Sequence, residues 1–90
     1  MRFCKTDGVI AEKIDGEYIV FNTDKESFFE LDEVGSMIWE LIDDSTIDQI
    51  TNAVMSEYDI SREQAQEDIR SFTNQLADNG LITVKETSTE

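Results

Sequence analysis

The chain has 90 residues, a formal net charge of −14 and 39% hydrophobic residues, with one cysteine and no histidine. This length allows one compact domain, and the hydrophobic content is that of a folded protein rather than a disordered one. The seven basic residues are widely separated, which argues against nucleic-acid binding, because neutralising phosphates needs clustered Lys and Arg.

The missing histidine excludes several kinds of catalytic and metal site. A Ser–His or Cys–His pair is impossible, and one cysteine leaves no soft metal site. The four glycines are isolated, so no phosphate-binding loop is present. We therefore expect no catalytic residue, no metal and no cofactor. A lone cysteine, no secretory signal and no apolar run of about 20 residues predict a cytoplasmic protein.

The first half of the chain predicts a three-stranded antiparallel meander. Val9–Ile14 and Glu17–Asn22 flank Asp15-Gly16, and an Asp-Gly pair between two such runs favours a type I′ hairpin turn. A second turn at residues 23–26 leads to a third strand at residues 27–31.

The second half predicts three helices. Asp32 is placed as the N-cap of the first, whose apolar face holds Val34, Met37, Ile38, Leu41 and Ile42, with Trp39 packing at its edge. Ser45 or Thr46 caps the second, which carries Ile47, Ile50, Val54 and Tyr58.

The third helix begins at Ser61, which with Gln64 has the spacing of a capping box. It ends at Asn79-Gly80, where glycine can adopt a left-handed conformation. A short extended segment at residues 81–84 is expected to close the core. Both ends are expected to be frayed, which leaves a folded core at about residues 9–84.

Several segments in this order resemble the PqqD family, also called the precursor-peptide recognition element. They are Ile19-Val20-Phe21-Asn22, Phe28-Phe29-Glu30-Leu31-Asp32, Ile38-Trp39-Glu40-Leu41, Ile47 to Ile50, Asp68-Ile69, Phe72, Leu76 and Gly80-Leu81-Ile82. The chain departs from the family in Leu31-Asp32, where Leu-Asn is common, and in Asp43-Asp44, where Asp-Gly is common.

The resemblance implies an α+β, winged helix-turn-helix-like fold in a single domain, with three antiparallel strands followed by three helices. It also implies a non-catalytic protein that binds the leader of a ribosomally made precursor peptide as an added strand. Such a protein presents the leader to a maturation enzyme. A lasso-peptide pathway with a leader peptidase and a cyclase is favoured, while pyrroloquinoline quinone (with a radical-SAM enzyme) and thioether-peptide pathways stay open.

The residues themselves suit strand addition, because the edge of a three-stranded sheet carries unpaired backbone groups. The expected peptide-binding residues lie on the third strand and on one face of the third helix: Ser27, Phe28, Phe29, Glu30, Leu31, Asp68, Ile69, Phe72, Gln75 and Leu76. For Ile69, Phe72 and Leu76 a core role is the competing interpretation, since any buried helix shows this spacing. The acidic balance predicts association with a basic partner that slows as salt rises.

Two other classes of function stay open. A winged-helix DNA-binding domain would need a basic third helix, whereas residues 62–79 hold two arginines and four acids. An acidic carrier or adaptor would use a modified Ser45. An unpaired strand edge also makes a strand-exchanged dimer conceivable.

Overall fold

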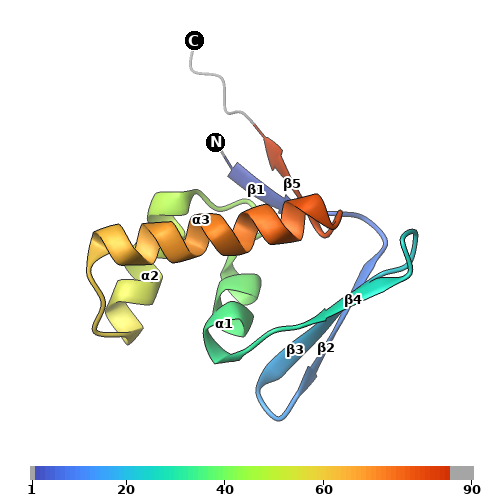
Figure 1. Ribbon diagram of the computed structural model, residues 1–90, viewed down its shortest axis with the longest axis horizontal. Helices are drawn as coiled ribbons and strands as arrows, with labels where there is room; N and C mark the ends of the chain where they lie inside the picture. Colours follow the sequence, from blue (N-terminus) through green and yellow to red (C-terminus); the bar gives the residue numbers. More distant parts are fainter. Residues whose placement is uncertain (1, 86–90) are drawn as a thin grey trace.

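The computed structural model describes residues 2–85 (Figure 1). In chain order the elements are β1 (Arg2–Lys5), β2 (Val9–Ile14), β3 (Glu17–Asn22), β4 (Ser27–Glu30), α1 (Glu33–Leu41), α2 (Ile47–Glu57), α3 (Arg62–Asp78) and β5 (Ile82–Lys85). The predicted α+β order of a three-stranded meander followed by three helices is confirmed.

The meander forms one antiparallel sheet in the order β2-β3-β4. Asp15 and Gly16 have φ angles of 53° and 88°, as a type I′ turn requires. The hairpin register pairs Ile14 with Glu17 and Val9 with Asn22. The predicted hairpin and its turn are therefore confirmed.

A second, two-stranded sheet joins the two ends of the described chain. Strand β1 pairs antiparallel with β5, and the two lie side by side in Figure 1. Phe3 on β1 is only 4% exposed and belongs to the hydrophobic core. The prediction of a frayed N-terminus is thus wrong for Arg2–Lys5, and the core reaches beyond residues 9–84, because β1 is stabilised by a partner strand from the far end of the chain.

The first two helices begin at capping residues that the sequence predicts, and the structure decides between Ser45 and Thr46. Asp32 accepts a 2.7 Å hydrogen bond from the Gly35 amide at the start of α1. Thr46, rather than Ser45, caps α2, and it forms a full capping box with Gln49. The Ser45 hydroxyl instead donates to the Leu41 carbonyl oxygen.

The capping box predicted for α3 is only half formed. Ser61 accepts a hydrogen bond from the Gln64 amide, but the Gln64 side chain turns forward and donates to Asp68 at 2.9 Å. Helix α3 ends as predicted, with Gly80 at a φ of 74° and the Leu81 amide bonded to the Leu76 carbonyl oxygen, which is the Schellman pattern.

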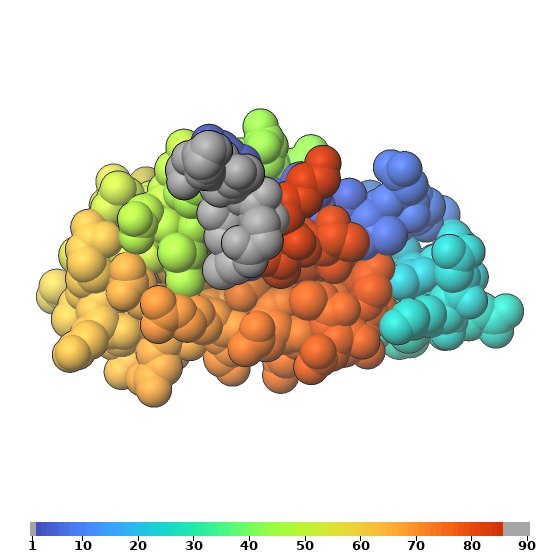
Figure 2. Space-filling model, turned by 90° about the horizontal axis from the view of Figure 1, so that it is seen from above, coloured from blue at the N-terminus to red at the C-terminus, as the bar shows by residue number. Residues whose placement is uncertain are grey.

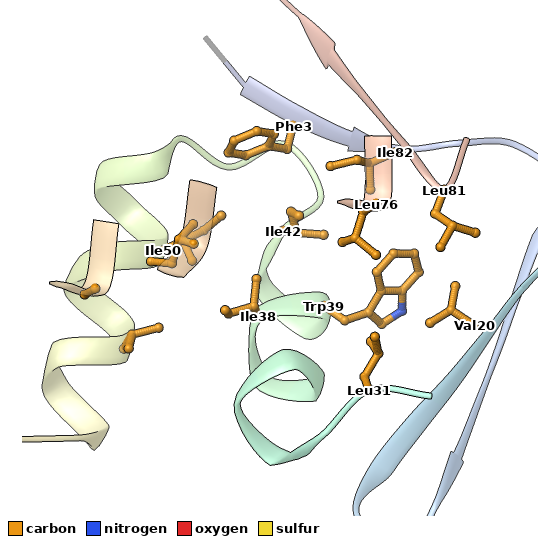
Figure 3. Close-up of a cluster of buried hydrophobic side chains, with 13 residues drawn as sticks. Phe3, Val20, Leu31, Ile38, Trp39, Ile42, Ile50, Leu76, Leu81 and Ile82 are labelled. Carbon is orange, nitrogen blue, oxygen red and sulfur yellow. The ribbon is translucent and has the colours of Figure 1, made fainter. Parts of the chain in front are cut away.

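The core lies between the helices and the helix-facing side of the sheets. Trp39 is 2% exposed, and Figure 3 shows its indole among Val20, Leu31 and Leu76. The Lys5 ammonium lies 4.6 Å from the centre of the Trp39 ring, which connects β1 to α1. The predicted packing role of Trp39 is confirmed. No helix in residues 2–85 is both long enough and apolar enough to span a bilayer.

Candidate functional site

One edge of the three-stranded sheet is open. In the described part of the chain β4 has β3 as its partner on one side and none on the other. The Leu31 amide donates to the Tyr18 carbonyl oxygen at 2.8 Å, and hydrogen-bonded positions alternate along an antiparallel pair. Phe29 and Ser27 therefore bond to β3 as well, and the backbone N–H and C=O groups of Phe28 and Glu30 point to the free edge.

A groove runs beside this edge, between β4 and α3. Two hollows of about 190 and 290 Å³ share Asp32 and Phe72 as lining residues. The first hollow is also lined by Phe29, Glu30, Leu31, Gln75 and Leu76, and the second by Val34, Gly35, Ile38 and Asp68. The groove thus follows α3 from the end of β4 to the first turns of α1.

Most of the predicted site residues meet at this groove. Phe29, Glu30, Leu31, Phe72, Gln75 and Leu76 line the first hollow, and Asp68 lines the second. Ser27, Phe28 and Ile69 line neither. Ile69 is 1% exposed within the core, so its competing interpretation as a core residue holds. Leu76, also 1% exposed, contributes to both core and groove.

The two neighbouring phenylalanines of β4 face opposite sides of the sheet. Phe29 is half-buried and packs against the core cluster on the helix-facing side. Phe28 is 60% exposed on the other side. Phe29 therefore contributes its side chain to the groove, whereas Phe28 contributes only backbone groups to the edge.

Gly35 allows α1 and α3 to approach closely at the groove. A Cβ atom at this position would lie 3.3 Å from two ring carbons of Phe72 and 3.1 Å from Asp32 Oδ1. Such contacts are tighter than ordinary van der Waals contact. The missing side chain of Gly35 thus makes room for the Phe72 ring, which lines both hollows.

The groove combines an apolar floor with an acidic rim. Its lining includes three carboxylates, Glu30, Asp32 and Asp68, and none of the eleven lining residues is basic. Asp32 is engaged with the Gly35 amide and Asp68 with Gln64, so both acids are held in place. An extended peptide with apolar side chains and some positive charge would match this lining.

Sequence reasoning missed four lining residues: Asp32, Val34, Gly35 and Ile38. The sequence predicts only a capping role for Asp32, and the residue performs this role while lining both hollows. The other three belong to the first turns of α1, and their spacing indicates only a buried helix face. No sequence signal shows that this face also meets α3 at a groove.

Away from the groove, Glu40 joins β2, β3 and α1. Its carboxylate accepts hydrogen bonds from Lys13 at 2.9 Å and Tyr18 at 3.0 Å. The Lys13 hydrogen bond lowers the pKa of Glu40, and the bond to Glu40 raises the pKa of both Lys13 and Tyr18. A similar bond from Tyr58 to Glu33 raises the pKa of Tyr58. Lys13, Glu33 and Glu40 are exposed and both tyrosines are half-buried. The Glu40 bonds therefore join α1 to the sheet near the surface, and the Tyr58 bond joins the end of α2 to α1.

A further hollow, of about 440 Å³, lies along the first turns of α3. Its lining is polar throughout: Ser61, Glu63, Gln64, Gln66, Glu67 and Arg70. It offers no apolar side chain to a ligand, so it differs in chemistry from the groove beside β4. Among residues 2–85, no cluster of three or more His, Cys, Asp or Glu side chains could hold a metal ion.

Comparisons with known proteins identify a family and a shared fold. The model of a family described as "Coenzyme PQQ synthesis protein D (PqqD)" matches residues 17–82. The solved structure "TbiB1 in Complex with the TbiA(beta) Leader Peptide" is 29% identical with a TM-score of 0.86, and the match covers 93% of this chain and 99% of that one. "Lasso peptide synthetase B1 complexed with the leader peptide" is 18% identical with a TM-score of 0.83, over 93% of this chain and 100% of that one. A search of curated proteins gave no match.

Proposed function

The chain belongs to the PqqD family, and from this premise we propose that it binds the leader segment of a ribosomally synthesised precursor peptide. The observation that carries the proposal is the free edge of β4 beside the groove walled by α3. The two similar solved structures are both complexes with leader peptides.

The leader would add as a strand to β4. The N–H and C=O groups of Phe28 and Glu30 would pair with its backbone, which provides affinity with little dependence on sequence. Alternate leader side chains would then enter the groove between Phe29, Leu31 and Phe72, where apolar contact provides selectivity. The carboxylates of Asp32 and Asp68 would favour leader segments that carry Lys or Arg.

The protein would act by holding the leader near an enzyme and not by chemistry of its own. Binding the leader while bound to an enzyme makes the encounter of the core peptide with the active site intramolecular. We propose a lasso-peptide pathway, with a leader peptidase and a cyclase as partners, because the 18% identical structure is a lasso peptide synthetase B1 bound to its leader and the 29% identical one is also a leader-peptide complex. Pathways to pyrroloquinoline quinone or thioether peptides are the alternatives, and each of these places the protein in the cytoplasm, where precursors are synthesised.

Amide hydrogen exchange with the precursor peptide encoded beside the gene tests this proposal. In the free protein the amides of Phe28 and Glu30 face solvent, whereas those of Phe29 and Leu31 already bond to β3. Strand addition should therefore protect Phe28 and Glu30 selectively, and NMR shifts should follow α3 from Asp68 to Leu76. Shifts confined to the polar hollow at Glu63 and Arg70, or no shifts at high peptide concentration, would rule the proposal out.

A further inference from the structure

The side of the β2-β3-β4 sheet that faces away from the helices has a distinct composition. The strand register places eight side chains on this outer face: Ile10, Glu12, Ile14, Glu17, Ile19, Phe21, Phe28 and Glu30. Five of them are apolar, three are acidic and none is basic. Ile10, Phe21 and Phe28 form one row across the three strands, so their side chains are direct cross-strand neighbours.

The outer face is not covered by any described part of the chain. Ile10, Ile14 and Phe28 are 55%, 51% and 60% exposed. None of the five apolar side chains on this face belongs to the core or packs against it, and Figure 1 shows the helices gathered on one side of the sheet. A contiguous apolar patch of this kind on a small protein marks a surface that another molecule covers.

A hollow of about 290 Å³ lies at the hairpin end of the outer face. Its lining brings Ile14 and Ile19 together with the carboxylates of Asp15, Glu17 and Glu30, and Tyr18 and Leu31 complete it. A lining that combines apolar side chains with three carboxylates matches an Arg or Lys side chain. The methylene groups of such a side chain pack on apolar surface, and its charged end pairs with the carboxylates. The lining of this hollow therefore favours a covering surface that carries positive charge.

From these features we propose that the outer face, the eight residues named above, binds a second protein through an apolar surface bordered by Arg or Lys. We identify this protein as the maturation enzyme to which the leader is delivered, so the inference rests on the proposed function. Of the eight outer-face residues only Glu30, at the end of β4, also borders the groove, while Phe28 and Phe29 face opposite sides of the strand. The leader and the enzyme can therefore be bound together.

The charge of the outer face argues against a second copy of the same chain as the occupant. Pairing two such faces would bring Glu12, Glu17 and Glu30 near identical carboxylates, and each chain carries a net charge of −14. Like charges in an interface oppose association. An enzyme surface with basic residues would gain from the same carboxylates.

A leader strand added at the free edge of β4 would widen the sheet, and its outward side chains would continue the outer face. An enzyme bound there would contact the leader as well as Phe28. The two binding events would therefore be coupled, and the coupling must be equal in both directions. The leader should raise the affinity for the enzyme, and the enzyme should raise the affinity for the leader by the same factor.

The test measures two affinities for the same set of variants. The full chain is titrated with the labelled precursor leader, and separately with each purified maturation enzyme encoded beside its gene, with and without leader. The variants are Ile10→Ser and Glu12→Gln, which alter the outer face outside the groove. Leu41→Ser and Glu67→Gln are matched controls, since Leu41 is 39% exposed on α1 and Glu67 is exposed on α3.

We expect Ile10→Ser to weaken enzyme binding roughly tenfold, as for an apolar contact at the centre of an interface. Glu12→Gln should lower the association rate and its dependence on salt. Leader affinity should stay within about twofold for both, and the controls should behave as the wild type, because none of these residues lines the groove.

Each other outcome has a definite meaning. Normal leader binding combined with enzyme affinities that are unchanged by both variants would overturn the inference and leave the proposed function standing. Failure of every enzyme to bind the wild type would also overturn the inference. A wild-type dimer in sedimentation that Ile10→Ser converts to a monomer would overturn it as well, because the occupant would then be a second copy of the chain. Failure of the wild type to bind the leader would instead contradict the proposed function.

Discussion

The Asn22 side-chain amide donates a 3.0 Å hydrogen bond to the Gly80 carbonyl oxygen, which joins the end of β3 to the end of α3. The same amide donates to the Asn79 carbonyl oxygen, while its oxygen accepts from the amides of Asp24 and Lys25. Figure 2 shows the C-terminal end of α3 against the β3–β4 turn. One buried side chain thus connects the end of α3 to the turn that leads into β4, and α3 and β4 are the two walls of the groove.

Replacing Asn22 with leucine tests this connection. Leucine has nearly the same shape but leaves two carbonyl oxygens and two amides without their partner, so we expect the free energy of unfolding to fall by about 2 to 4 kcal/mol. Urea denaturation measures the loss, and leader affinity should fall with it. Asn74→Leu, at an exposed position on α3, should change stability by less than about 0.5 kcal/mol. Equal effects at both positions would refute a special role for Asn22.

Adding a methyl group at Gly35 should affect the groove more than the fold. In Gly35→Ala the new Cβ would press on the Phe72 ring at 3.3 Å, while alanine favours the helix by about 1 kcal/mol over glycine. We expect stability to change little and leader affinity to fall about tenfold, equivalent to about 1.4 kcal/mol. Isothermal titration and urea denaturation of the same variant measure the two effects. Ser56→Ala on the exposed face of α2 is the control, and an unaltered leader affinity for Gly35→Ala would show that the Phe72 ring yields freely.

The hydrogen bonds from Lys13 and Tyr18 to Glu40 predict how the stability of the protein depends on pH. The pKa of Glu40 is lowered in the folded protein from its usual 4.5, so its contribution is present above pH 4.5 and is lost as pH falls through the folded value. The pKa values of Lys13 and Tyr18 are raised, so their contributions are lost as pH rises above about 10.

Denaturation curves of the wild type and Glu40→Gln, recorded from acidic to strongly basic pH, show whether stability is lost in the predicted directions. The variant should be less stable near neutral pH, and the two proteins should converge at both extremes of pH. Glu67→Gln, at an exposed acid without a side-chain partner among the described contacts, should follow the wild type throughout. If the difference in free energy of unfolding between the wild type and Glu40→Gln stays constant with pH, the bonds to Glu40 do not account for that difference.

Strand β1 should contribute substantially to stability. Phe3 is 4% exposed, and truncating a buried phenylalanine to alanine costs about 3 to 5 kcal/mol. Its cross-strand partner Val84 is 44% exposed, so Val84→Ala should cost less than about 1 kcal/mol. Urea midpoints of the two variants compare them directly. If Phe3→Ala unfolds the chain, Phe3→Leu should show a smaller loss of the same kind, and a midpoint equal to that of the wild type would mean that β1 is not part of the core.

Local elements of this protein follow from its sequence, because each depends on groups only a few residues apart. Asp15-Gly16 allows the two positive φ angles of the hairpin turn, Asp32 caps the amide of Gly35, and Gly80 permits the left-handed residue that ends α3. The periodic apolar faces of the helices and the alternation of the strands depend on the same short range. The order of elements and the identification of β4 as an edge strand could therefore be predicted.

Only the tertiary structure decided which of these elements meet. The pairing of β1 with β5 joins residues about 80 positions apart, and no local pattern of a four-residue strand shows such a partner. The orientation of Phe28 and Phe29 depends on which side of the sheet the helices cover, and the approach of Phe72 to Gly35 depends on how α3 crosses α1. Long-range packing settles these choices, because burial and close contact depend on positions in space and not on spacing along the chain.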